Sequence, residues 1–191
     1  MRVAVTGGAG YIGSHTEVEL LGAGHEVLIL DSFANAAPDV PDRIAGITGH
    51  SPHVAQLDIT DAPALTSALK DFAPDAALHF AGLKAVGEAV ADPLEYYRVN
   101  VSGSLTLMRA MEEAGCTRLV FSSSATVYGE PDIVPTPEDH PLQPANPYGQ
   151  SKRMVEQMIN DWGVANGQVA GINLRYFTPV GAHASAQIGE A

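Results

Sequence analysis

Apolar residues along the chain gather in short runs that alternate with longer stretches in which they recur at helical spacing. The short runs, which have the length and residue types of buried parallel strands, lie at residues 3–5, 26–30, 54–59, 76–80, 118–122 and 169–175. The amphipathic stretches lie at residues 11–22, 62–72, 94–114 and 151–165. Strands that alternate with helices form right-handed βαβ units. The pattern therefore predicts an α/β fold, a doubly wound parallel sheet with helices on both faces.

Turn-forming residues concentrate in segments 32–50 and 124–147, and the second of these is rich in proline. Long loops inside a compact domain are usually functional or mobile. Neither segment has the composition of a linker, so we expect the strands and helices to form one domain.

The amino-acid composition and the net charge disfavour several classes of function. With 191 residues, 46% of them apolar, the chain can bury a full core. A net charge of -12 would repel phosphate backbones and anionic lipid, which disfavours nucleic-acid binding and a polybasic membrane anchor. The single cysteine, Cys116, cannot form an internal disulfide and is expected to fill space near a helix end. No signal peptide or membrane-spanning window is visible, so the sequence predicts a cytoplasmic protein.

A glycine-rich loop, TGGAGYIG at residues 6–13, follows the first strand and opens the first helix. The glycines Gly7, Gly10 and Gly13 allow a tight turn and a close approach to a pyrophosphate, while the helix N-terminus offers unpaired N–H groups to the anion. Alone, such a loop can be a tight turn without a ligand. Asp31 ends the next strand at about the ~20-residue spacing of a dinucleotide site, so the combination predicts nucleotide binding.

Two acidic residues at strand ends bear on the cofactor. The Asp31 carboxylate can accept hydrogen bonds from a ribose 2′-hydroxyl and would repel a 2′-phosphate, and residues 32–36 contain no Arg or Lys to neutralise one. NAD is therefore expected over NADP. Asp58 ends the third strand, where it could either face a ligand or cap the helix that starts near Asp61.

A candidate acid–base group lies in the C-terminal third. Tyr148 and Lys152 are four residues apart, hence on one face of a helix that begins near Pro147. A neighbouring cation favours the phenolate of a tyrosine, whose ordinary pKa near ~10 makes it a poor base. Ser124 ends the fifth strand and could hold a substrate hydroxyl. Together these groups could remove a proton from an alcohol while its hydride leaves for NAD.

This combination resembles the extended short-chain dehydrogenase/reductase family. Further motifs are similar to the UDP-glucose 4-epimerases within that family: TGGAGYIGSH at 6–15, HFAGLKAVGE at 79–88, PLEYY at 93–97, FSSSATVYG at 121–129 and LRYFTPVGAH at 174–183. The resemblance implies reversible interconversion of UDP-galactose and UDP-glucose, in which bound NAD transiently oxidises the sugar at C4.

The resemblance also implies residue roles. Tyr148 would be the acid/base, Lys152 would lower its pKa and hold the nicotinamide ribose, and Ser124 would bind the 4-hydroxyl. Besides these three and the glycines, the positions implied to line the NAD site are Tyr11, Ile12, Asp31, Ser32, Phe33, Ala34, Asn35, Ala36, Asp58, Ile59, Phe80, Ala81, Gly82, Leu83, Lys84, Asn100 and Phe177. The positions implied to contact substrate are Lys84, Ser124, Thr126, Tyr148 and Thr178.

Alternatives remain. Lys84 could be an ordinary surface lysine, and His79 is expected to pack in the sheet, since no histidine spacing suggests a metal. Dehydratases and decarboxylases of this family place acidic residues after the strand-five hydroxyl, where this chain has Ala125 and Thr126, neither of which can serve as that acid or base. Another reductase acting on a nucleotide sugar and a non-catalytic NAD-binding module remain open.

Two features depart from the implied pattern. Thr178 stands where an asparagine usually contacts the substrate diphosphate. The chain also ends where the family continues into a smaller substrate domain, so we expect residues 1–176 to form the NAD-binding domain and residues 177–191 to begin a truncated region. Such a chain is expected to bind NAD but to epimerise poorly. The resemblance further implies a homodimer through helices within 94–115 and 151–166.

Overall fold

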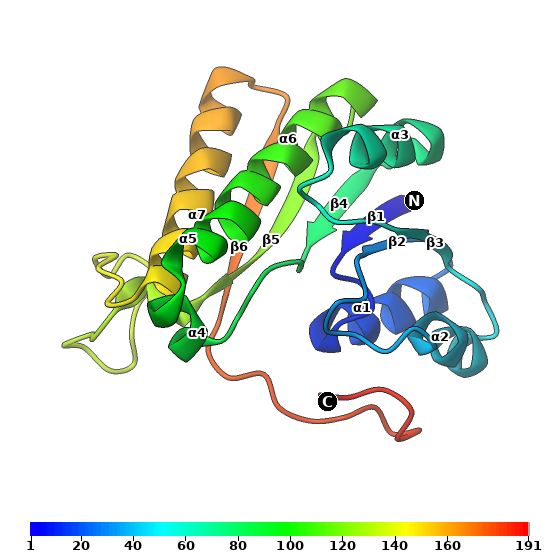
Figure 1. The fold of residues 1–191 in the computed structure, drawn as a ribbon, viewed down its shortest axis with the longest axis horizontal. Helices are drawn as coiled ribbons and strands as arrows, with labels where there is room; N and C mark the ends of the chain where they lie inside the picture. The colour runs from blue at the N-terminus through cyan, green and yellow to red at the C-terminus, as the bar shows by residue number, and fades with distance from the viewer. Residues whose placement is uncertain (191) are drawn as a thin grey trace.

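The computed structural model describes residues 1–190, and its centre is a single parallel sheet (Figure 1). The strands are β1 (Arg2–Thr6), β2 (Glu26–Asp31), β3 (His53–Gln56), β4 (Ala76–His79), β5 (Arg118–Ser124) and β6 (Ala170–Tyr176). They are all parallel, in the order β3-β2-β1-β4-β5-β6. The predicted doubly wound α/β fold is confirmed.

Helices cover both faces of this sheet, which makes three layers (Figure 1). The α-helices are α1 (Tyr11–Gly22), α2 (Val40–Thr48), α3 (Ala62–Phe72), α4 (Val86–Ala91), α5 (Pro93–Tyr96), α6 (Gly103–Ala114) and α7 (Pro147–Ala165). One hydrophobic cluster joins the sheet to α1 and α2, and the other joins it to α3, α6 and α7. Strands β1, β2 and β4 thus place alternate side chains in opposite clusters, as the centre of a parallel sheet requires.

Several element boundaries differ from the prediction. Segment 32–50 contains α2, which places Val40 and Ile44 in the core against α1. The helix predicted over 94–114 is interrupted by a π-helical turn, Tyr97–Ser102. Strand β3 ends at Gln56, before the predicted 59. Helix α7 begins at Pro147, which is four residues before the periodic pattern but agrees with the start expected for the Tyr148–Lys152 pair, because the Asn146 side chain accepts a hydrogen bond from Gly149 N at 2.8 Å and caps it.

Two predicted core residues lie as expected. Cys116 is buried just after α6, and burial raises the pKa of its thiol. His79 is buried in the sheet with its ring nitrogens 2.7 Å from Thr6 Oγ1 and 2.7 Å from Ser104 Oγ, and burial lowers its pKa to about 3. Over residues 1–190, no helix is long and apolar enough to cross a membrane.

The strand order reverses between β1 and β4, which sets the position of a ligand site. A crevice forms at such a switch point, outside the carboxyl ends of the strands. The residues after β6 return along this edge: Tyr11 Oη donates to Gly181 O at 2.7 Å, and Ile188 is buried among core residues of α1 and α2. The predicted domain boundary at 176 coincides with the end of β6, and residue 191 of the predicted second region lies outside the described residues.

Candidate functional site

The glycine-rich loop connects β1 to α1 at the switch point. Gly7 has φ of +67°, and a Cβ there would lie 2.5 Å from Ala81 N. A Cβ on Gly13 would lie 2.3 Å from Gly7 O, so neither position has room for a side chain. Helix α1 begins after Gly10 with no side-chain cap. The N–H groups of its first turn are therefore available to an anion, and this backbone cradle fits a pyrophosphate.

Asp31 lies at the end of β2 beside this loop. Its Oδ2 accepts from Ala9 N at 3.0 Å and its Oδ1 accepts from Phe33 N at 2.8 Å. These bonds fix the carboxylate between the glycine-rich loop and the segment after β2. Each carboxylate oxygen keeps a second lone pair for a ligand hydroxyl, so the geometry fits the ribose contact expected from the sequence.

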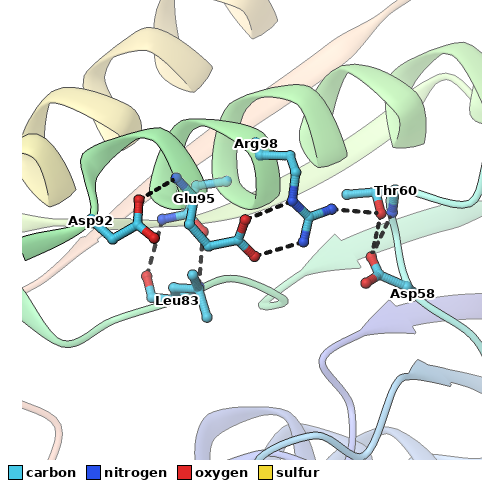
Figure 2. Close-up of polar contacts among 7 residues, drawn as sticks. Asp58, Thr60, Leu83, Asp92, Glu95 and Arg98 are labelled. Carbon is cyan, nitrogen blue, oxygen red and sulfur yellow. Dashed lines mark hydrogen bonds and ion pairs between the residues drawn. The ribbon is translucent and has the colours of Figure 1, made fainter. Parts of the chain in front are cut away.

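Asp58 closes a turn after β3 and is not the cap of the following helix (Figure 2). Its Oδ1 accepts from both Thr60 N and Thr60 Oγ1 at 2.8 Å, whereas Asp61 caps α3 through Ala64 N. The alternative that Asp58 caps α3 is therefore wrong. The backbone bond from Thr60, helped by its side chain and by the charge of Arg98, lowers the pKa of Asp58.

Arg98 joins this turn to the helical segment before α6 (Figure 2). Its guanidinium pairs with both carboxylate oxygens of Glu95 at 2.7 Å and donates to Thr60 Oγ1 at 3.3 Å. Ile59, predicted to line the cofactor site, is buried in a position where a Cβ on Gly103 would be 2.6 Å from its Cδ1. The side chain of Ile59 thus packs against α6.

The segment after β4 is held in place by Asn100. Asn100 Oδ1 accepts from Leu83 N at 2.8 Å, and Nδ2 donates to Leu83 O at 3.0 Å and to Ser151 Oγ at 3.2 Å. Asn100 lies in the π-helical turn, a feature that recurs at functional sites. It therefore connects the predicted cofactor segment 80–84 to the helix that carries Tyr148.

Tyr148 and Ser124 meet at the carboxyl end of β5. Burial raises the pKa of Tyr148, while hydrogen bonding with Ser124 and the charge of Lys84 act to lower it. Ser124 Oγ accepts from Thr126 N at 3.2 Å and from Thr126 Oγ1 at 2.9 Å. The structure thus brings together the predicted phenol and two hydroxyls.

Lys152 lies one turn after Tyr148 and is buried. Its Nζ donates to Ser122 O at 2.8 Å and lies 5.8 Å from the centre of the Tyr148 ring. Burial lowers the pKa of Lys152 to about 8. In this structure Lys84, rather than Lys152, is the cation whose charge lowers the pKa of Tyr148. Lys152 is therefore held by the end of β5, one helical turn after Tyr148.

The remaining predicted residues are more exposed. Lys84 Nζ forms an ion pair with Glu190 Oε1 at 2.8 Å. Phe177 is 69% exposed, and Thr178 is exposed beside it. Residues 32–36 follow Asp31 along the same edge, with Phe33 and Ala36 packed on the cluster under α1 and α2.

Sequence reasoning missed three charged groups that are buried or half-buried close to this site. Glu17 lies on α1 beneath the glycine-rich loop, and Glu156 of α7 pairs with Arg175 of β6 at 2.7 Å. In the sequence, the one sign of their burial is that each stands among the apolar residues of a predicted helix or strand. That position does not reveal which residue is its partner.

The comparisons with known proteins agree with this geometry. The model of the NAD dependent epimerase/dehydratase family matches residues 3–190. The chain is 49% identical over 190 residues to UDP-glucose 4-epimerase of Bacillus subtilis, covering 100% of this chain and 56% of that protein. The human enzyme of that name is 49% identical over 196 residues, covering 99% of this chain and 56% of the relative. The chain thus spans about half the length of the curated relatives it matches.

Solved structures of UDP-glucose 4-epimerases share the fold of this chain. A UDP-glucose 4-epimerase from Stenotrophomonas maltophila with bound NAD and formylated UDP-arabinopyranose is 50% identical, with a TM-score of 0.98 over 100% of this chain and 57% of the other. The Bifidobacterium longum enzyme in complex with NAD+ and UDP is 42% identical, with a TM-score of 0.97 and the same coverage.

Proposed function

The chain belongs to the NAD dependent epimerase/dehydratase family, and we propose that it carries the cofactor site and the acid–base residues of a UDP-glucose 4-epimerase. The observation that carries this proposal is the placement of two groups of residues on either side of the strand-order switch. The glycine-rich loop and Asp31 lie on the β1–β2 side, and Ser124, Tyr148 and Lys152 lie on the β4–β5 side. A dinucleotide bound across the switch extends from the first group to the second.

NAD is the cofactor that these residues favour. The tight backbone packing at Gly7 and Gly13 turns the chain so that N–H groups of the loop and of α1 can face a pyrophosphate, and Asp31 is fixed where a ribose hydroxyl could donate to it. A 2′-phosphate would meet this carboxylate without a compensating Arg or Lys in residues 32–36. The proposed lining also includes Tyr11, Asp58, the segment 80–84, Asn100 and Phe177.

When bound beside these residues, NAD would supply reversible hydride transfer at C4 of the sugar. Tyr148 removes the proton from the 4-hydroxyl and gives it back, while Ser124 holds that oxygen by a hydrogen bond. Burial opposes the phenolate of Tyr148, so its formation depends on Ser124 and on positive charge near the ring. Lys152 holds the ribose, Lys84 supplies positive charge near the phenol, and Lys84 and Thr126 contact the substrate with Thr178.

The two residues after Ser124 narrow the reaction class. The hydroxyl of Thr126 is bonded to Ser124 Oγ at 2.9 Å, and Ala125 has no ionisable group. Elimination of water needs a further acid or base here, so epimerisation is favoured over dehydration. With this activity the protein acts on UDP-sugars in cytoplasmic galactose metabolism.

A homodimer completes the proposal. The helices expected at its interface are α5–α6 and α7, which expose Leu94, Leu105, Met154 and Val164. Light scattering coupled to size-exclusion chromatography tests it: a mass of one chain at micromolar concentration contradicts the dimer for this chain.

The cofactor assignment is tested by purifying the chain and recording its mass and absorbance spectrum for bound NAD. We expect NAD to bind and NADP to bind at least tenfold more weakly. The absence of NAD binding contradicts the cofactor site, and equal affinity for NADP contradicts the role of Asp31.

The acid–base assignment is tested separately by mixing the NAD-bound chain rapidly with UDP-galactose and following the transient reduction of bound NAD at 340 nm, before the hydride returns to the sugar. Tyr148→Phe should retain NAD and abolish the reduction. Tyr97→Phe, at a tyrosine in the π-helical turn, serves as the matched control and should leave both unchanged. Reduction by Tyr148→Phe at the unsubstituted rate would overturn the assigned base.

A further inference from the structure

A buried polar network joins β5, α7 and β6 behind the proposed acid–base residues. Its centre is Glu156 on α7, which is 3% exposed. Arg175 of β6 donates to both oxygens of this carboxylate, from Nε at 3.0 Å and from Nη2 at 2.7 Å. Ser123 of β5 donates its hydroxyl to Glu156 Oε1. A carboxylate removed from water thus receives donors from two neighbouring strands.

The network touches the elements that carry the proposed chemistry without being part of it. Ser123 directly precedes Ser124 at the end of β5. Glu156 lies four residues after Lys152 and eight after Tyr148, so all three share one side of α7. The bond from Ser123 to Glu156 therefore fixes the end of β5 against the helix that presents the phenol.

Arg175 extends the same network into the segment after β5. Its Nη1 donates to Tyr128 Oη at 2.8 Å and to Glu138 O at 2.9 Å. Tyr128 ends the short 3-10 helix Ala125–Tyr128, which contains the Thr126 hydroxyl bonded to Ser124. Both flanks of Ser124 are thereby attached to one guanidinium–carboxylate pair.

Stability alone does not account for such a pair. A buried ion pair is often no more stabilising than apolar residues of similar volume, because desolvating the charges offsets their attraction. Apolar neighbours are present on both elements, since Phe121 of β5 and Val155 and Ile159 of α7 belong to the same hydrophobic cluster. The polar pair adds geometric specificity. A bidentate guanidinium–carboxylate contact fixes one relative position of the two elements, whereas apolar contacts permit several.

We propose that Glu156 and Arg175, together with Ser123, are positioning residues that hold the end of β5 against α7 and so keep Ser124 beside Tyr148. The proposal rests on the proposed function in one respect, that Tyr148 is the acid–base residue. When the network is removed, the strand end and the helix keep their apolar packing but lose the contacts that set their relative register. Ser124 then moves away from the phenol of Tyr148, and the phenolate form of Tyr148 loses a hydrogen bond that would stabilise it.

Two variants test this without leaving a charge unpaired. Ser123→Ala removes one donor from Glu156 and leaves the ion pair intact. The double variant Glu156→Met/Arg175→Met replaces the pair by apolar side chains of similar length. The matched control is Lys70→Met/Glu113→Met, which removes an exposed ion pair of 2.7 Å between α3 and α6.

The first measurement is the pKa of Tyr148, from the alkaline ultraviolet difference spectrum of each protein against the same protein carrying Tyr148→Phe. We expect the double variant to raise this pKa by about one unit, the shift that corresponds to one hydrogen bond of ordinary strength. Ser123→Ala should shift it in the same direction by less, and the control should leave it unchanged. A merely structural role would lower the melting temperature without moving this titration.

The second measurement is the rate of NAD reduction by UDP-galactose, with NAD affinity determined alongside. We expect the rate in the double variant to fall at least tenfold while NAD affinity stays within twofold. Folded variants in which Tyr148 titrates at its original pKa overturn the positioning role, and Ser123→Ala decides the matter if the double variant does not fold. A shifted Tyr148 titration with an unchanged rate refutes the acid–base function of Tyr148, not the positioning of Ser124.

Discussion

Glu17 lies on the inner side of α1, directly beneath the glycine-rich loop, and its side chain is fully buried. Neither of its carboxyl oxygens has a hydrogen-bond partner within residues 1–190. It fills the space next to Gly8, where a Cβ would lie 2.0 Å from Glu17 Oε1. Burial, reinforced by the negative charge of Asp31, raises the pKa of Glu17 well above its usual range. We therefore predict that Glu17 stays a neutral acid to a higher pH than an exposed Glu and becomes a destabilising group above its raised pKa.

The sign follows from proton binding in the two states. An unfolded Glu releases its proton near pH ~4.3, whereas folded Glu17 keeps it to a higher pH. Between those values the folded chain binds one more proton than the unfolded chain, so the free energy of unfolding falls by about 1.4 kcal/mol per pH unit. The contribution is fully present below the unfolded pKa and is lost as pH rises through the folded pKa. A further ~1–3 kcal/mol reflects the carboxyl group without a partner.

Other charged groups near Glu17 do not offset this effect. On α1 itself, Glu19 is exposed and His15 is half-buried. Asp42 and Arg43 of the neighbouring α2 are exposed, and Arg43 pairs with Asp39 at 2.8 Å. Arg2 of β1 lies at the opposite end of that strand from the glycine-rich loop. Asp31 is therefore the charge that acts on Glu17.

The assay is urea unfolding between pH 5 and 8. Glu17→Gln keeps the shape but cannot ionise, so it should remove this pH slope and be more stable than the unsubstituted chain at pH 8, by about 1.4 kcal/mol for each pH unit between the unfolded and folded pKa values. Glu17→Leu also removes the unpaired polar atoms and should gain more. Glu19→Gln, at an exposed carboxylate on the same helix, is the control and should follow the unsubstituted protein. The reasoning is refuted if Glu17→Gln has the same unfolding free energy as the unsubstituted chain at every pH.

Three further predictions concern the proposed site. Gly13→Ala should weaken NAD binding at least tenfold in a fluorescence titration, because its Cβ would lie 2.3 Å from Gly7 O, while Gly22→Ala, with open space around it, should bind normally. Lys152→Met should abolish NAD reduction yet stabilise the fold by about 3 kcal/mol at pH 7, because burial lowers the pKa of Lys152 from 10.5 to about 8 at ~1.4 kcal/mol per unit. Asn100→Ala should cost about 1–2 kcal/mol in urea unfolding and weaken NAD binding, because it releases Leu83.

The pH dependence of the Lys152 variant provides its own check. Folded Lys152 loses its proton at a lower pH than the unfolded residue does, so its destabilising effect is largest at pH 7 and disappears as pH rises from about 8 to ~10.4. The advantage of Lys152→Met should shrink over that range, and a constant advantage would contradict a buried ammonium. Normal NAD affinity in the Asn100→Ala variant would contradict the role of Asn100, because segment 80–84 would then keep its conformation without the bonds from that side chain.

The structural features that depend on short stretches of sequence could be predicted. Short apolar runs, helical patterns, the glycines after the first strand and the acid at the end of the second each depend on residues close together in the chain. For that reason the sheet, most of its helices, and the placement of Asp31 and the Tyr148–Lys152 pair followed from the sequence. Helix α2 did not, because its nine residues begin among prolines and take their stability from packing Val40 and Ile44 against α1.

Other features depend on residues that meet only after folding. The sequence left two roles open for Asp58, a ligand contact and a helix cap. Only the structure shows that its carboxylate accepts a hydrogen bond from the backbone N–H of Thr60. Glu156 is recognisable as a partner of Arg175 only when α7 packs on β6, and Glu17 is recognisable as an unpaired acid only when α1 packs beneath the glycine-rich loop. The sequence by itself determined the order of elements and the identity of the chemical groups, because those follow from local periodicity. Tertiary structure alone decided which of those groups are desolvated and which are paired, because both depend on contacts between distant parts of the chain.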